Sequence, residues 1–257
     1  MIPVFSMNIF GALLVFIRIF SMLLFAPIFG NDAIPIRLQV IISILFTMVI
    51  YPIVSETLRV PFSLDLLMLA LLVGKEAMLG IIFGFAATIV MSIMRYTGDF
   101  LGRLIGFHEG NIVDPFFQDD VGFVGHFYSI LFMLLFLSLN GHHFIIQIIA
   151  KSFSIAAVGD VTITGPLVQK ISSMIGDIFL FGIKFSAPIL AFIIITTVAF
   201  GILGKAIPEM NLLIMMLPAK ILIGLVGIIV IFPFVFVIMK QLITGLYRDL
   251  ELILHLV

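Results

Sequence analysis

The stretch IFGALLVFIRIFSMLLFAPIF at residues 9–29 is apolar over a length that can cross a bilayer, yet it carries Arg18 near its middle. Five more apolar segments follow, at about residues 38–54, 64–94, 123–150, 178–203 and 212–237. The third contains Lys75 and Glu76, and the sixth contains Lys220. An ionised group in hydrocarbon costs roughly 3 kcal/mol or more, so such groups usually face protein or a water-filled path. The pattern indicates a membrane-associated assembly built around a conduit.

The composition excludes a soluble globular domain. Hydrophobic residues make up 63% of the 257 residues and charged residues 11%, whereas a soluble domain has about 45–50% and about 25%. Another chain or lipid must therefore cover much of the surface. The net charge of −1 argues against nucleic acid, and the absence of cysteine removes disulfides and thiolate chemistry. With 28 Phe, four Tyr and no Trp, the aromatic belt usual at a bilayer interface is weak.

The apolar segments predict an all-α protein. The third and fourth segments are too long for one simple crossing, so each is either broken or extends beyond the membrane. Pro188 and Pro233 lie inside segments and predict kinks. The last two segments form a helical hairpin over 178–237. A cleaved signal peptide carries basic residues before its apolar core. No basic residue precedes the first apolar segment, so we expect its helix to be retained. Basic residues divide five against four between the two sides, which leaves the orientation open.

Glycines recur every four residues at two places. They are Gly80 and Gly84, then Gly98, Gly102, Gly106 and Gly110. On a helix each set forms a ridge that lets another backbone approach closely. One interpretation is general helix packing, and the other adds a bend of the chain after Gly106, since glycine tolerates such bends.

The segment GFHEGNIVDPFFQDDVG at residues 106–122 has little helical patterning. Asp114 and Pro115 form a turn signal, and Phe116 and Phe117 lie between acidic residues. One hypothesis is a plug-like loop whose aromatic side chains close a pore, because non-helical backbone at membrane depth lines a cavity or is buried in protein. The other is an exposed loop with the Phe pair docked on the protein itself. The plug candidates are Gly106, Phe107, Asp114, Pro115, Phe116, Phe117 and Gly122.

The charges inside apolar segments allow two interpretations. Lys75 with Glu76 is a candidate proton-coupled pair, and Arg18 a candidate counter-ion for a substrate. The alternative is that these charges pair with one another or with partner chains. We favour this structural role for Arg18, Lys75 and Glu76, because no dense carboxylate or histidine relay accompanies them. Lys205 and Lys220 are likewise expected to be buried or at an interface.

No enzyme chemistry is indicated. His142 and His143 are adjacent, so on a helix they point about 100° apart and chelate one metal poorly. We expect a helix–loop boundary there, with hydrogen-bonded imidazoles. Nucleophile elbows, phosphate-binding loops and dinucleotide fingerprints are absent from the sequence. We therefore expect no catalytic residue, cofactor or metal.

Six short motifs appear in a fixed order along nearly the whole chain. They are Arg18 with Ala26–Gly30 and Ile34–Arg37; Gly74–Glu76 with Gly80 and Gly84; the Gly98/Gly102 ridge leading to Asp114–Pro115; Leu139–His142; Gly201–Asn211; and Leu217–Lys220 with Gly224. In this order and spacing the chain resembles the FliR family of flagellar biosynthesis proteins and its injectisome counterparts. Lys205 and Glu209 stand where the family more often has Arg and Gln.

The resemblance implies a subunit of the flagellar type III export gate in the bacterial inner membrane, at the flagellar basal body. It implies a P-like part at 1–177 with the plug loop 106–122, and a Q-like hairpin with a C-terminal tail at 178–257. One such R subunit would join several P and Q subunits in a helical, closed-ended hetero-oligomer. The B-type export switch subunit, unfolded export substrates and membrane lipid are the other implied partners. Much of the apolar chain would lie above the bilayer plane.

Two alternatives remain. A virulence-type injectisome gate is a protein of the same class, and neighbouring genes would separate it from a flagellar gate. A small ion or solute transporter belongs to a different class, and it predicts a stable single-protein or homo-oligomeric particle with bound substrate.

Overall fold

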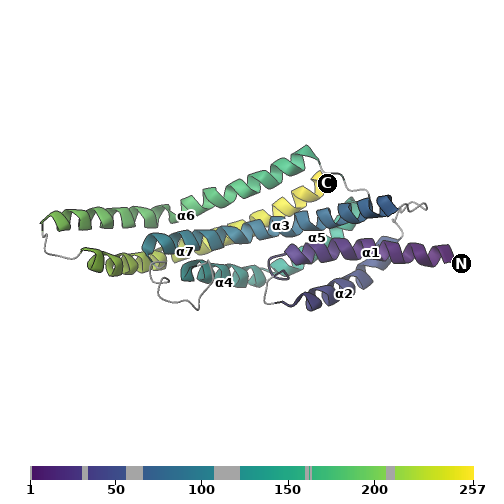
Figure 1. The fold of residues 1–257 in the computed structure, drawn as a ribbon, viewed down its shortest axis with the longest axis horizontal. Coiled ribbons are helices and arrows are strands. Elements are labelled where there is room, and N and C mark those ends of the chain that lie inside the picture. Colours follow the sequence, from purple (N-terminus) through teal and green to yellow (C-terminus); the bar gives the residue numbers. More distant parts are fainter. Residues whose placement is uncertain are drawn as a thin grey trace. The chain divides into compact units, whose positions relative to one another are not determined.

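The computed structural model describes residues 2–30, 34–55, 66–106, 122–159, 162, 164–206 and 212–257, with side chains of the first helix from residue 9 and of the last from residue 215. This part of the chain contains α-helices and no strand (Figure 1). The helices are α1 (Ile2–Phe25), α2 (Ile36–Val54), α3 (Leu66–Ile105), α4 (Phe123–Ser138), α5 (Gly141–Ile155), α6 (Gly165–Ala206) and α7 (Leu212–Leu256). The predicted all-α class is confirmed.

The two long apolar segments behave differently. The third forms a single helix, α3, of 40 residues. The fourth is broken between α4 and α5, where Asn140 has a left-handed backbone with φ of 58°. Asn tolerates this conformation better than most residues, and Gly141 follows it. Helix α4 therefore ends at Ser138, and α5 begins at Gly141, directly after Asn140.

The hairpin helices are longer than the sequence pattern predicted. Helix α6 has 42 residues and continues past Pro188, and α7 has 45 and continues past Pro218 and Pro233. Helix α7 continues to Leu256, so the residues assigned to the C-terminal tail are helical.

The chain folds into two compact units that are both discontinuous in sequence. The first comprises Met1–Val90, Phe136–Met174 and Ile243–Val257, and the second comprises Met91–Leu135 and Ile175–Leu242. The predicted division at residue 177 follows from the family resemblance and stays a prediction.

The first unit has a helical core. Its buried side chains recur every three or four residues, which is the spacing of one helix face. They include Leu14, Val15, Ile19 and Leu23 of α1; Leu79, Phe83 and Ala86 of α3; Ile145, Ile148 and Ile149 of α5; and Ile243, Leu246, Leu250 and Ile253 of α7.

The end of α7 is fastened within this unit by polar contacts. Thr164 Oγ1 donates to the Leu256 carbonyl at 2.7 Å, and Lys170 Nζ lies 2.7 Å from Asp249 Oδ1. Together with the four buried α7 side chains, these contacts make the last turns of the chain part of the core.

The second unit brings helices together at glycines. A Cβ at Gly98 of α3 would lie 2.8 Å from Gly125 Cα and 2.8 Å from the Val124 carbonyl of α4. Gly224 of α7 lies directly against the side chain of Ile105. Any larger residue would force these helices apart.

Four of the described helices, α2, α3, α6 and α7, are long and apolar enough to cross a membrane. Their burial differs: 56% of the apolar window of α3 is buried, but only 22% of that of α6 and 11% of that of α7. Much of the apolar surface of α6 and α7 is therefore left for other molecules to cover.

Candidate functional site

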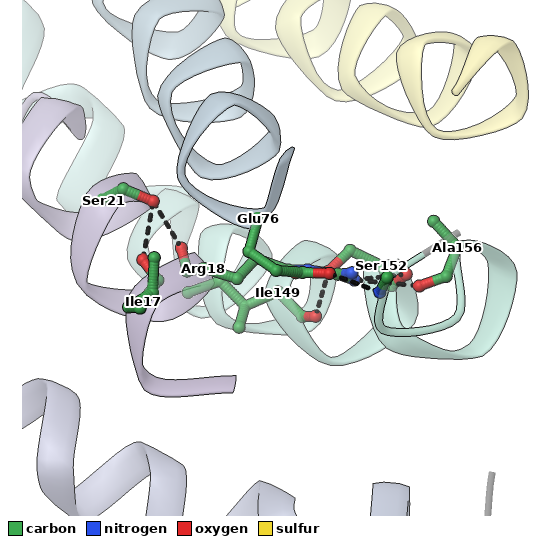
Figure 2. Close-up of polar contacts among 8 residues, drawn as sticks. Ile17, Arg18, Ser21, Glu76, Ile149, Ser152 and Ala156 are labelled. Carbon is green, nitrogen blue, oxygen red and sulfur yellow. Dashed lines mark hydrogen bonds and ion pairs between the residues drawn. The ribbon is translucent and has the colours of Figure 1, made fainter. Parts of the chain in front are cut away.

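A buried ion pair joins α1 to α3 in the first unit. Arg18 Nε lies 2.5 Å from Glu76 Oε2, and the two side chains are 1% and 0% exposed. Figure 2 shows Arg18 reaching from α1 past Glu76 to the end of α5. The two residues are 58 positions apart in the sequence.

Both members of the pair also bind backbone groups at the end of α5. Arg18 Nη1 donates to the carbonyls of Ser152 and Ala156, both at 3.0 Å (Figure 2). Because α5 ends at Ile155, these are carbonyls of its last turn and its C-cap, where a cation is favourable. Glu76 Oε1 accepts the Gly159 N–H at 2.8 Å. The pair thus fixes α1, α3, the end of α5 and the turn that follows it.

Two further features surround the guanidinium. Its Cζ lies 4.3 Å from the centre of the Phe153 ring, a cation–π contact. Its Nη2 is buried without a hydrogen-bond partner. An unsatisfied buried donor normally costs about 1–3 kcal/mol, so the other contacts must offset this cost.

The geometry gives the pair a structural role. Both oxygens of Glu76 are engaged, one by Arg18 and one by Gly159. Lys75 is exposed on another face of α3, since adjacent helical residues point about 100° apart. This arrangement does not support the alternative in which Lys75 and Glu76 form a proton-coupled pair. Nor does the described part of the chain contain a group of three or more His, Asp or Glu side chains that could hold a metal.

Gly80 and Gly84 bring α1 onto α3 beside the ion pair. A Cβ at Gly80 would collide with Ser21 Oγ and the Arg18 carbonyl, and one at Gly84 would lie 2.6 Å from the Met22 carbonyl. Thr88 Oγ1 also donates to the Phe25 carbonyl. The close approach of the two helices is what lets Arg18 reach Glu76.

The predicted plug segment has well-defined ends. Gly106 terminates α3 with a φ of 94°, and its N–H donates to the carbonyl of the buried Gly102 at 3.1 Å. At the other end, the Gly122 N–H donates to Asp99 Oδ1 at 2.9 Å. Asp99 Oδ2 also lies 3.0 Å from Arg103 Nε. Among the plug candidates, Phe107, Asp114, Pro115, Phe116 and Phe117 lie outside the described residues, and their role stays a prediction.

Sequence reasoning did not single out Asp99. An acidic side chain that accepts from the first N–H groups of a helix is a common cap, so the residue type was informative. The capped helix, α4, starts 24 positions later in the chain, so only the fold reveals the contact.

The other selected residues are not partners of the ion pair. Lys205 is exposed near the end of α6, and Lys220 is half-buried in α7. His142 and His143 lie at the start of α5, as predicted, with ring centres 4.2 Å apart. His142 Nδ1 is buried without a hydrogen-bond partner, which departs from the predicted hydrogen-bonded imidazole at this one nitrogen.

The profile of the family described as bacterial export proteins, family 1, matches residues 9–246. The chain belongs to this family. Its relatives include the flagellar biosynthetic protein FliR of Bacillus subtilis, 27% identical over 253 residues that cover 95% of each chain. The FliR of Borreliella burgdorferi is 30% identical over 238 residues, which cover 91% of this chain and 87% of that one. The resemblance to the FliR family is confirmed across the whole alignment.

Membership in this bacterial export family gives the apolar helices a context. The family's named relatives are components of flagellar biosynthesis, and this chain shares their length over nearly its full extent. The chain is a membrane protein in composition and in helix length. The exposed apolar faces of α6 and α7 are surfaces for other proteins or for lipid.

Proposed function

We propose that this chain is a subunit of the flagellar type III export gate in the bacterial inner membrane, at the flagellar basal body. It forms part of the channel for unfolded flagellar substrates and catalyses no reaction. The observation that carries this proposal is the match to the export family over residues 9–246, together with relatives named as flagellar biosynthetic proteins. The energy for export comes from other components.

The exposed side of the α6–α7 hairpin supports a place within a larger assembly. Phe179 and Phe234 are 71% and 61% exposed. A Cβ added at Gly176 or Gly201 would meet no atom within 4 Å. Small residues on an open helix face let a second helix approach closely, and aromatic residues are enriched in protein interfaces. We assign this face to contacts with Q-type gate subunits.

A hollow in the same hairpin supports this assignment. It measures about 340 Å³ and has almost entirely apolar walls. Phe192 of α6 and Leu222, Val226 and Val230 of α7 are among its lining residues. Side chains of a neighbouring helix would fill such a hollow and remove its walls from water or lipid. P-type subunits would contact the helices on either side of the segment 106–122.

The transporter alternative lacks a mobile ionisable centre in the described residues. The buried carboxylate of Glu76 is held by Arg18 and by the Gly159 N–H. A proton or ion carrier needs a buried group that exchanges its partner during transport. The fully engaged pair favours a fixed structural joint instead.

Residues 106–122 are proposed to hold the channel closed between export events. The segment leaves α3 at Gly106 and returns at Gly122, where Asp99 fastens the first turn of α4. Replacing residues 107–121 with a Gly-Ser linker should let cells leak ions and become sensitive to external salt. An unchanged membrane conductance, with the complex still assembled, would count against the plug.

The subunit role is tested by purification. Pulling a tagged copy of this chain from cells that co-express the P-type, Q-type and B-type candidates should recover a hetero-oligomer. Gly176→Leu and Gly201→Leu should each reduce the recovered Q-type subunit, because they fill the open face that its helices need. Ile202→Leu, on the same exposed turn, is the matched control and should leave recovery unchanged. Full recovery with both Leu variants would exclude this face as the contact.

A further inference from the structure

Helix α2 buries polar side chains and exposes apolar ones. The face that it packs against the rest of the first unit begins with the polar residues Gln39, Ser43 and Thr47, which are 5%, 0% and 8% exposed. Its outer face is apolar, with Met48, Val49 and Ile53 exposed by 67%, 67% and 75%. A helix surrounded by water would show the opposite arrangement.

The two buried hydroxyls bond within the same helix, whereas Gln39 Nε2 donates to the Ile34 carbonyl at 3.3 Å and its Oε1 is buried without a partner. Ser43 Oγ donates to the Gln39 carbonyl at 2.7 Å, and Thr47 Oγ1 donates to the Ser43 carbonyl at 2.7 Å. With their hydroxyls satisfied, these small side chains offer a compact surface to α1, which packs beside α2 (Figure 1). Small polar residues are typical of helix contacts inside membranes. The residues of α2 suited to protein contact are therefore already used within the chain.

The outer face has the composition of a lipid contact. Between residues 38 and 53 its exposed side chains are aliphatic, apart from one proline. They are Leu38, Ile41, Ile44, Leu45, Met48, Val49, Pro52 and Ile53. This set lacks the aromatic and arginine anchors of protein interfaces and the small residues of close helix packing. By contrast, the exposed face of the α6–α7 hairpin carries phenylalanine side chains as well as glycines at which an added Cβ would meet no other atom.

The length and the ends of α2 also fit a bilayer. Its 19 residues extend about 29 Å at 1.5 Å per residue, and the hydrocarbon core is about 30 Å thick. Arg37 is exposed at the first turn, and Tyr51 is half-buried in the last turn. Arg and Tyr are the residues that anchor helix ends at the two interfaces. No charged residue lies between them.

We propose that the outer face of α2, centred on Ile41, Leu45 and Met48, lies against the acyl chains of the bilayer. The inference rests on α2 alone and holds whether or not the chain serves as a gate subunit.

The test is photo-crosslinking in living cells. The photoreactive residue p-benzoylphenylalanine is placed at Leu45 or at Met48 in the full chain, co-expressed with its candidate partners. After irradiation, the expected product is this chain with a mass increase of one phospholipid and no higher band on a denaturing gel. Both positions point outward, so the substitutions leave the packed core of the first unit untouched.

Phe179 of α6 is the matched position, because p-benzoylphenylalanine is close to phenylalanine in shape and the site is equally exposed. The proposed function expects a protein adduct there. A protein adduct at Leu45 and Met48 would show that a partner covers α2 and would overturn the lipid assignment. Absence of any adduct there, with Phe179 reacting, would also overturn it, because surrounding acyl chains would react. A missing protein adduct at Phe179 alone would count against the proposed subunit contact and leave the lipid contact standing.

Discussion

Replacing Glu76 with glutamine is the sharpest test of the buried joint. The variant keeps the size of the side chain but removes its charge, which leaves the Arg18 guanidinium buried without a counter-charge. The two side chains are 1% and 0% exposed, so solvent cannot compensate. Removing one partner of such a pair costs about 3–5 kcal/mol. At 1.4 kcal/mol per factor of ten, the ratio of folded to unfolded chain falls by roughly 150- to 4,000-fold.

Lys75→Gln is the matched control. It removes one charge at the neighbouring position of α3, where the side chain is exposed. An exposed substitution of this kind changes stability by about 0.5 kcal/mol or less. The assay compares the two variants by the amount of chain in the membrane fraction and by the temperature of half-loss in detergent. The variant Glu76→Gln should be depleted and should unfold at a lower temperature, whereas Lys75→Gln should match the unsubstituted chain.

A charge exchange distinguishes an ion pair from the wider joint. In the double variant Arg18→Glu with Glu76→Arg the two charges still attract each other. However, Glu at position 18 would face the carbonyls of Ser152 and Ala156, and Arg at position 76 would face the Gly159 N–H. We expect no rescue. Equal stability of Glu76→Gln and Lys75→Gln would refute the reasoning, and full rescue by the exchange would refute the role of the backbone contacts.

Two further substitutions and one deletion test the helix packing and the hydrogen bond at the start of α4. Gly80→Ala should lower the free energy of unfolding by about 1–3 kcal/mol, because its Cβ would collide with α1. The control Gly74→Ala, on an open part of α3, should be neutral or stabilising. Thermal unfolding in detergent compares the two variants. Asp99→Asn should lower the free energy of unfolding by about 1 kcal/mol, because the charged hydrogen bond from the Gly122 N–H becomes a neutral one. The same assay should show a modest decrease in the unfolding temperature. Deleting Ile243–Val257 removes five buried apolar side chains worth about 1.5–3 kcal/mol each, so the chain should fail to accumulate in membranes. Normal accumulation would contradict the docking of α7.

The sequence predicted that intramembrane charges need partners, but it could not say which partners. Lys75 and Glu76 are neighbours in the chain, and that adjacency suggested a pair. On a helix, successive side chains point about 100° apart, so only one of the two can face the core. Arg18 comes from another helix 58 positions earlier, and its contact with Glu76 depends on the close crossing of α1 over α3 at Gly80. The glycine spacing predicted a close approach without identifying the partner helix.

The last turns of α7 follow a periodic sequence pattern that the prediction from hydropathy did not include. Charged residues after Val237 lowered the local hydropathy, and the hairpin was predicted to end there. The buried Ile243, Leu246, Leu250 and Ile253 recur every three or four residues, which is the pattern of an amphipathic helix. Asp249 and Glu251 lie on the outer side and pair with lysines of the same unit. Hydropathy alone finds buried or lipid-facing helices, whereas periodicity is needed where a helix is amphipathic.

The polarity of α2 could not be assigned from the sequence. The segment 38–54 was recognised as apolar, and its few polar residues, Gln39, Ser43 and Thr47, gave no direction by themselves. In a soluble protein they would face outward, and in a membrane protein inward. The fold decides this, because α1 lies on their side.

The most direct measurement of the central claim is the mass of the intact complex that a tagged copy of this chain brings out of co-expressing cells. The exposed faces of α6 and α7 need partners to cover them, so we expect a hetero-oligomer. The family resemblance implies one copy of this chain with several copies of the P- and Q-type subunits. A stable particle that contains this chain alone, with those helices covered by detergent or lipid and the partner proteins present in the same cells, would contradict it.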